Sequence, residues 1–376
     1  MTLFDLYNTD TKSYYDIQYI ADKLFPGTSA EDEARECERF LYEHYMEGKK
    51  LELLRGDLYK QYEKKGKHVH SASLYLLGKA LMPCFQEKLN AALSAFLPNY
   101  EAWNDGSRDL LYTWYLPSMF HDYASCIELD MIQPGEVEQL NYANHRNLLD
   151  SHLKNQGIQY SLYGDYPYHV SSVPVRFSQE LVADYFYYRS CEGSCEHGIL
   201  AGYLFFDHFV KLFRKKTKNA IFEKDGNCRA FGLTWNKELV SYAAYAADAI
   251  ICHNIWMAGP GEKEKYEKYG LGQLLWNDHP ENKLNINKYP LQFMLCLLDT
   301  IEPTKRFTSM LAYEILHKIS ILEDAEKSGF TIAWKDLSTE NGEFENWHKN
   351  IMGLKDWMDV ECKADDSNSM IQIKWC

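Results

Sequence analysis

The chain has 376 residues, of which 46% are hydrophobic and 25% are charged; this usage is typical of globular proteins and excludes a disordered chain as the expectation. That length allows two domains, or one large domain with an appendage. The formal net charge of −14 disfavours long-range attraction to nucleic-acid backbones and anionic membranes, so a phosphate-bearing substrate would need a local positive charge such as a bound metal ion.

The start of the chain, MTLFDLYNTDTKSYYD, contains neither a basic segment nor the apolar run of a secretory signal. No stretch of ~18 apolar residues is present, so the sequence predicts no membrane-spanning helix. Ten cysteines are scattered among the predicted helices, and without a signal they are expected to be reduced thiols. We therefore expect a cytoplasmic protein that binds neither a membrane nor a nucleic-acid duplex.

Hydrophobic periodicity predicts successive helices over most of the chain. They are expected at 30–64 (one long surface helix or two), 71–97 with a break near Pro83, 107–128, 136–154, 177–190, 196–215, 236–257 and 290–303. Pro290 suits the first position of its helix, and Pro303 ends it. Loops are expected at 156–175, 217–234 and 259–287.

The composition changes beyond about residue 315, where short β-strands are predicted. The expected strands are 318–322, 329–335 and 369–375, with an amphipathic helix at 343–361. The predicted fold is therefore mainly α, with an N-terminal helical extension (1–65), an all-helical domain (66–314) and a small α+β appendage (315–376).

The first candidate metal ligands are the adjacent His121 and Asp122, which follow the apolar helix in DLLYTWYLPSMFHDYA. Both side chains can reach one cation, and imidazole with carboxylate suits Mn, Fe or Zn. A His-Asp dipeptide is nevertheless common by chance, so this pair alone also fits a surface or helix-capping position.

A second candidate is Asp299, in the apolar segment YPLQFMLCLLDTIEP. An ionised carboxylate in a buried helix is costly unless it is paired or bound to a metal. The alternatives are an ion pair with a nearby Lys or Arg, and a polar exit of the helix beside Glu302.

Three further histidines lie on or beside apolar helices: His70 in KHVHSASLYLLG, His197 in CEHGILAGYLFFDHF and His253 in AADAIICHNIWM. Taken alone, each of them is more often a hydrogen-bonded core residue or a helix cap than a ligand. Taken in chain order with the others, they give the pattern His…His-Asp…His…His…Asp.

With this pattern the sequence resembles the HD-domain superfamily of metal-dependent phosphohydrolases. The resemblance spans about residues 69–307 and rests on the segments HSASLYLLG, WYLPSMFHDYA, EHGILAGYLFFD, ICHNIW and YPLQFMLCLLDTIEPTKRF. It implies a multi-helix HD-domain-like bundle for the central domain. No GYP-type motif follows the His-Asp pair, so the cyclic-di-GMP phosphodiesterase branch is not supported.

The resemblance also implies the metal ligands. His70, His121, Asp122 and Asp299 would hold a first divalent ion, and Asp122 could bridge to a second ion held by His197 and His253. The cofactors expected are one or two divalent ions (Mn, Fe, Zn, Mg, Ni or Co). Glu196 and Asn254 are the neighbouring candidates for orienting the imidazoles.

The expected reaction is hydrolysis of a phosphomonoester, phosphodiester or nucleotide-like substrate by metal-activated water. Asp122 would be a catalytic residue at the metal ions. Lys305 and Arg306 could bind a phosphate, and the alternative for these two residues is a solvated basic turn. The basic run of Lys211, Arg214, Lys215 and Lys216 is better explained by the helix dipole.

Other motifs are weak or absent. Cys191, Cys195 and His197 lack the second Cys/His pair of a zinc finger, and no Walker loop, G-x-S-x-G or G-x-G-x-x-G segment is present. Two alternatives to an enzyme stay open: an HD fold kept as a non-catalytic metal- or nucleotide-binding module, and a structural helical protein whose histidines belong to the core. A homo-oligomer is also compatible with the sequence.

Overall fold

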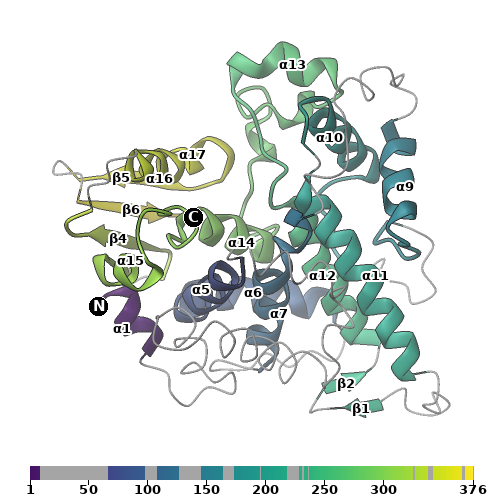
Figure 1. Ribbon diagram of the computed structural model, residues 1–376, viewed down its shortest axis with the longest axis horizontal. Helices are drawn as coiled ribbons and strands as arrows, with labels where there is room; N and C mark the ends of the chain where they lie inside the picture. Colours follow the sequence, from purple (N-terminus) through teal and green to yellow (C-terminus); the bar gives the residue numbers. More distant parts are fainter. Residues whose placement is uncertain are drawn as a thin grey trace.

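The computed structural model describes residues 1–8, 67–97, 108–126, 145–163, 173–194, 196–217, 228–230, 233–235, 237–324, 327–337, 342–365 and 369–375. The protein is mostly helical and has a small four-stranded antiparallel sheet near its C-terminal end (Figure 1). The predicted helix at 30–64 lies outside the described residues, as does the 136–144 part of another.

The helices of the body agree closely with the apolar periodicity of the sequence. They are α5 (Lys67–Ala80), α6 (Met82–Phe96), α7 (Arg108–Phe120), α9 (His145–Asn155), α10 (Gln179–Cys191), α11 (His197–Thr217), α12 (Lys237–Cys252) and α14 (Pro290–Ile301). The break predicted near Pro83 falls at Leu81, between α5 and α6. A short 3-10 turn, Tyr123–Cys126, follows α7.

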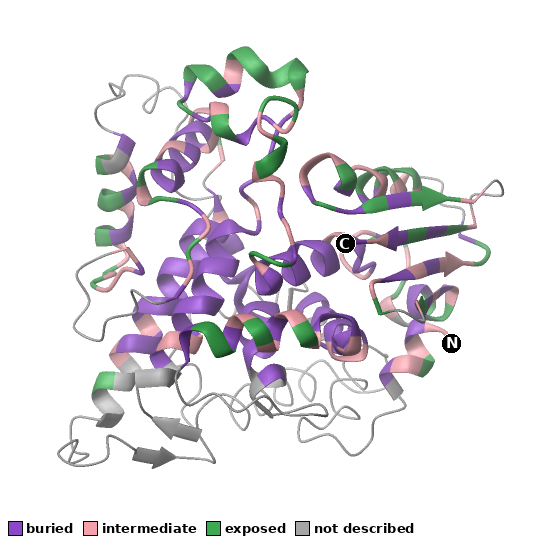
Figure 2. Ribbon diagram, turned by 180° about the vertical axis from the view of Figure 1, so that it is seen from behind, coloured by how far each residue is buried: buried purple, intermediate pink, exposed green. Residues whose placement is uncertain are grey.

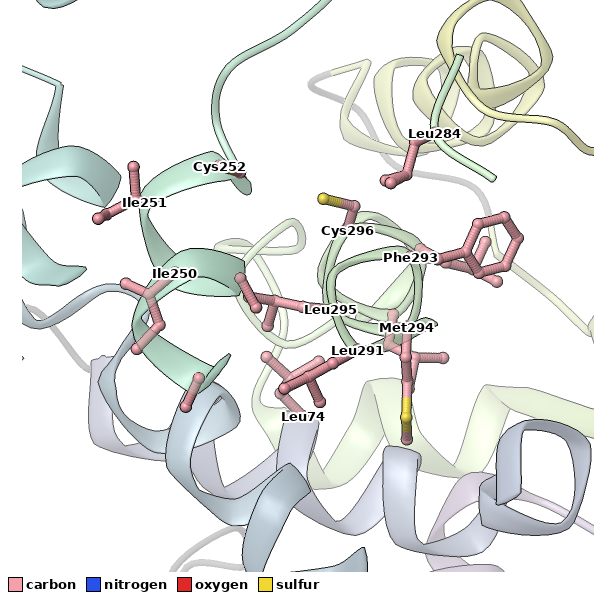
Figure 3. Close-up of a cluster of buried hydrophobic side chains, with 14 of the residues drawn as sticks. Leu74, Ile250, Ile251, Cys252, Leu284, Leu291, Phe293, Met294, Leu295 and Cys296 are labelled. Atoms are coloured by element: carbon pink, nitrogen blue, oxygen red, sulfur yellow. The ribbon is translucent and has the colours of Figure 1, made fainter. Parts of the chain in front are cut away.

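Helix α14 lies at the centre of the body. Apart from Thr300, every one of its residues is largely buried, and it contacts α5, α6, α7, α12 and α16 (Glu343–Met352). Figure 3 shows its apolar side chains directed to several sides of the helix, among them Leu291, Phe293 and Leu295. A helix that is apolar all round requires cover on all sides, and this explains why it forms the core seen in Figure 2.

Helices α11 and α12 approach each other closely because small residues line their contact. A Cβ atom at Gly198 would lie 2.7 Å from His253 Cε1, and one at Gly202 would lie 2.8 Å from the carbonyl oxygen of Ala247. Neither distance is tolerated by real side chains. The glycines of α11 therefore fix the position of the segment that carries His253.

The C-terminal sheet has the strand order β3-β4-β6-β5, with all neighbours antiparallel. Its strands are β3 (Ile319–Glu323), β4 (Gly329–Trp334), β5 (Glu361–Ala364) and β6 (Met370–Lys374). One face is buried, through Ile319, Ile321, Phe330, Ile332, Ile371 and Ile373. This alternation is the period of two that predicted the strands.

Two tryptophans join the sheet region to the helical body. The Trp347 side chain donates its indole N–H to the carbonyl oxygen of Ile301 at 3.1 Å, and Trp375 packs on Phe85 and Phe293 with ring centroids 5.2 and 5.7 Å apart. The start of the chain also lies here, since α1 (Leu3–Asn8) packs on α15 (Ala312–Lys318) and β3.

Several boundaries differ from the sequence-based prediction. The 259–287 segment contains the helix α13 (Lys263–Lys268) and three 3-10 turns, and a hairpin of β1 (Cys228–Ala230) and β2 (Leu233–Trp235) lies within the predicted loop at 217–234. The helix predicted at 343–361 ends with α17 (Leu354–Trp357) and is followed by β5. These short elements span too few residues to show a hydrophobic period. Among the described helices, none is long and apolar enough to cross a membrane.

Candidate metal centre

The six candidate ligands, distant in sequence, meet in the interior of the helical body. His70 lies on α5, His121 and Asp122 follow α7, His197 begins α11, His253 follows α12, and Asp299 lies in the last turn of α14. They form two groups, His70–His121–Asp299 and Asp122–His197–His253, each with ligand atoms within 4.8 Å of one another. Both groups contain the residue types that could hold a metal ion.

The first group is compact. His70 Nε2 lies 3.0 Å from Asp299 Oδ1 and 3.2 Å from His121 Nε2, and His121 Nε2 lies 3.3 Å from Asp299 Oδ1. Ligand atoms at about 2.1 Å from a transition metal are separated from each other by about 3.0 Å at right angles and about 3.4 Å at tetrahedral angles. The three separations therefore match the spacing of neighbouring ligands around one ion.

The carboxylate of Asp122 lies between the two groups. Its Oδ1 is 3.2 Å from His197 Nε2, whereas its Oδ2 is 3.6 Å from His121 Nε2 and 3.7 Å from His70 Nε2. The ring of His253 completes the second group at 5.6 Å from the ring of His197, and it lies 5.3 Å from that of His121. One carboxylate thus offers a different oxygen to each group.

Hydrogen bonds on the outer nitrogens orient three of the four imidazoles. His70 Nδ1 lies 2.6 Å from Glu302 Oε2, His121 Nδ1 lies 3.1 Å from the Ser118 carbonyl oxygen, and His253 Nδ1 lies 2.6 Å from the Ile250 carbonyl oxygen. Carbonyl and carboxylate oxygens only accept, so Nδ1 carries the proton in each ring. The Nε2 lone pairs are therefore free to face the ligand groups, the usual arrangement around a protein-bound metal.

Glu302 was missed as a functional residue by the sequence analysis. It is fully buried, and its Oε1 accepts hydrogen bonds from Ser73 Oγ at 2.6 Å and from the Thr304 N–H at 2.9 Å. The signal that could have identified it is its spacing: it follows Asp299 by three residues, which places both carboxylates on one side of the helix end.

Glu196 and Asn254, predicted to orient imidazoles, both lie beside His197. Asn254 Nδ2 is 2.7 Å from His197 Nε2, and Glu196 Oε1 is 3.8 Å from His197 Nδ1. Glu196 is itself held by Arg189, whose Nε donates to Oε2 at 3.3 Å. The structure thus brings both predicted neighbours to the second group.

The two predicted phosphate-clamping residues are placed differently. Lys305 forms an ion pair with Asp299 Oδ1, so its ammonium lies at the first ligand group. The Arg306 side chain has a buried Nε without a hydrogen-bond partner in the described part of the chain, and no described contact joins it to the ligands. Lys305, and not Arg306, is therefore the cation of this site.

Burial and charge set the ligands in the protonation states that metal binding requires. Burial lowers the pKa of His121 and lowers that of His253 to about 3, which keeps these imidazoles neutral. Burial by itself raises the pKa of Asp299, but Lys305, His121 and His70 outweigh it, and the net pKa is well below the usual range. The carboxylate is therefore ionised.

The centre is only partly shielded from solvent. The side chains of His197, Lys305 and Asp299 are 20%, 18% and 12% exposed, whereas those of His70 and Asp122 are buried.

No protein-family model, curated protein or solved structure matches this chain.

Proposed function

We propose that this chain is a metal-dependent phosphohydrolase with an HD-domain-like helical body and a binuclear centre. The observation that carries the proposal is the convergence of six ligands from five separate segments into two groups. Histidines that only fill a core have no reason to cluster with each other and with carboxylates. A buried cluster of imidazoles and carboxylates costs stability unless an ion compensates it. The sequence segments that resemble the superfamily contain all six residues.

Under this proposal His70, His121, Asp299 and Asp122 would hold the first ion, and His197, His253 and Asp122 would hold the second. Mixed nitrogen and oxygen ligands suit Mn, Fe, Zn, Co or Ni better than Mg, which prefers oxygen ligands and keeps several waters. The lowered pKa values of His121 and Asp299 favour a neutral imidazole and an ionised carboxylate, which are the states that metal binding requires.

When bound, the ions would supply an activated water and a positive field for phosphoryl oxygens. The protein would supply the rest. Asp122 would be shared between the two ions, and the Lys305 ammonium, next to Asp299, would neutralise charge on the phosphate. The buried rings of His70, His121 and His253 would exclude water, which strengthens electrostatic interactions in the site.

Metal analysis of the purified protein, followed by hydrolysis assays on a panel of phosphomonoesters, phosphodiesters and nucleotides with added Mn, tests the proposal. We expect about two ions per chain and metal-dependent release of phosphate. His121→Ala should lose the ion of the first group and the metal-dependent release of phosphate. His279→Ala should change neither, because the His279 side chain lies at the surface, where it pairs with Glu281.

The outcomes separate the alternatives. Stoichiometric metal without turnover on any substrate would favour a binding module instead of an enzyme. Absence of stoichiometric metal from a folded protein would leave the histidines as core residues and reject the proposal.

A further inference from the structure

A second buried polar cluster lies along α12 and α14, on the side of the Val173–Ser178 segment. Val175 in this segment is 41% exposed, but the guanidinium of its neighbour Arg176 turns inward. Arg176 Nη2 donates to the carbonyl oxygen of Asn282 at 3.1 Å. Arg176 Nη1 is buried and has no hydrogen-bond partner in the described part of the chain.

No carboxylate of the described residues forms an ion pair with Arg176. Asp248 is close, but its Oδ1 accepts the Arg176 backbone N–H, at 3.3 Å, and not a guanidinium N–H. The contacts of the guanidinium are aromatic: it lies 4.5 Å from the ring centre of Phe177 and 6.0 Å from that of Tyr289. A buried cation without an anionic partner is rare because its lost hydration must be compensated.

Gln292 on α14 is a second unpartnered group. It is 2% exposed, and neither Nε2 nor Oε1 has a hydrogen-bond partner among the described residues. It shares a helix face with Tyr289 and Cys296, at spacings of three and four residues. The Arg176 charge acts on both of these neighbours, since it opposes the rise that burial causes in the pKa values of Tyr289 and Cys296.

The relative position of α12 and α14 places Gln292 near Arg176. Cys296 Sγ donates to the carbonyl oxygen of His253 at 3.6 Å, and Figure 3 shows this sulfur pointing toward the end of α12 that carries Cys252. At the other end, the backbone of Leu291 lies beside the Tyr245 hydroxyl. The two helices therefore run in the same direction, and Gln292 lies about level with Asp248.

Arg176 Nη1 and the Gln292 amide are therefore two buried groups without a hydrogen-bond partner among the described residues. We call Arg176 and Gln292 the Arg176 cluster.

The chemistry of the Arg176 cluster is that of an anion receptor. The guanidinium and the amide nitrogen both offer N–H donors, and Gln292 Oε1 is the sole side-chain acceptor of the pair. Asp248 does not neutralise the cation through a side-chain bond, and burial raises its pKa to about 7. A water molecule could satisfy the amide, but it would leave the buried charge without a hydrogen-bonded anion.

We propose that the Arg176 cluster binds a small oxyanion or a carboxylate group, at a site separate from the metal centre. Gln292 precedes Asp299 by two helical turns, which is about 10 Å along the axis of α14. The anion would accept from Arg176 Nη1 and from the Gln292 amide. This site does not depend on the proposed hydrolase activity.

Calorimetric titration of the full-length, chelator-treated protein with inorganic phosphate, and separately with acetate, tests this site. We expect saturable binding of at least one of the two at one site per chain. Arg176→Met and Gln292→Leu should weaken that binding at least about tenfold, the effect of removing a charge-assisted or buried hydrogen bond. Lys363→Met, which removes an exposed cation paired with Glu361, should have no effect.

Lys305→Met separates this site from the metal centre. Binding that survives Lys305→Met but not Gln292→Leu supports the proposal, and binding of acetate with the same dependence assigns the carboxylate class. Loss of binding in Lys305→Met alone, equal binding in all variants, or no saturable binding in the wild type would overturn it. If Arg176→Met does not fold, Gln292→Leu provides the same comparison.

Discussion

The metal centre and the Arg176 cluster are both buried polar regions on α12 and α14, and they differ in how their polar groups are paired. In the centre, three imidazoles have an outer acceptor and Asp299 has Lys305. In the cluster, the guanidinium and the amide keep unpaired atoms. The difference indicates that the protein itself orients the ligands of the centre, whereas the cluster keeps donors that the proposed anion would pair.

The largest effect is expected from breaking the centre at Asp122. Asp122→Asn removes the charge that lies between both groups, so we expect loss of at least one ion per chain and a fall in phosphatase activity of more than about 100-fold, beyond the usual effect of losing an outer contact. Metal analysis and initial rates measure this. Asp278→Asn, at a partly exposed aspartate paired with Lys263, is the control, and equal activity in the two variants would contradict the role of Asp122.

The next largest effect concerns the free energy of unfolding and its dependence on Asp248, which lies beside Arg176. Burial raises the pKa of Asp248 from 3.8 to about 7, although the Arg176 backbone N–H and charge and the Cys252 hydrogen bond lower it. The folded state therefore holds this proton more tightly than the unfolded state, and folding loses stability as pH rises from about 4 to about 7.

Asp248→Asn should remove this pH dependence. Between pH 5 and pH 8 the wild type should lose about 3 kcal/mol more unfolding free energy than the variant, because each pKa unit corresponds to about 1.4 kcal/mol. Urea unfolding at the two pH values measures the difference. Parallel pH profiles of the two proteins would show that Asp248 is ionised throughout this range.

A smaller effect is expected when an outer contact of the centre is removed. Glu302→Gln keeps the size of the side chain but removes the charge that faces His70 Nδ1. Its single amide oxygen can accept either from His70 or from Ser73 and Thr304, and the other position then holds an NH₂ group that cannot accept. We expect metal affinity to fall about 10- to 100-fold. Competition with a metal-binding dye measures it, and unchanged affinity, as expected for the surface control Glu345→Gln, would show that Glu302 has only a structural role.

The sequence was sufficient to predict the elements that carry the centre. Pro290 and Pro303 delimit α14 as predicted, and the break between α5 and α6 falls close to Pro83. The six candidate ligands could be selected because each lies on or beside an apolar helix and because together they follow the order of the HD-domain pattern. The mainly helical fold and the three strands predicted near 319–374 are confirmed.

The cluster could not have been predicted in the same way. Arg176 lies in a short segment without periodicity, and its inward direction depends on Asn282, which is 106 residues away in sequence. The orientation of Glu302 toward His70 likewise depends on a hydrogen bond from Ser73, which lies on another helix. Helix α13 was not predicted, because Tyr266 is its sole buried residue and one buried residue gives no periodic pattern.

The smallest expected effect tests how tightly the second ligand group is held. Gly198→Ala would place a methyl group 2.7 Å from the His253 ring and 3.1 Å from the Ile250 carbonyl oxygen, so the ring must move. Overpacking of this kind costs about 1–3 kcal/mol, and the small size of a methyl group favours the lower end. Gly261→Ala meets no atom within 4 Å and should leave stability within about 0.5 kcal/mol of the wild type.

The readout that distinguishes displacement of His253 from a general loss of stability is metal stoichiometry at a temperature where both variants are folded. Gly198→Ala should weaken the ion bound by His197 and His253 and leave the ion at His70, His121 and Asp299 in place, because the added methyl group touches only the second group. Equal weakening of both ions would show that the two ligand groups respond together through Asp122. The two groups would then differ in position but would not bind their ions independently.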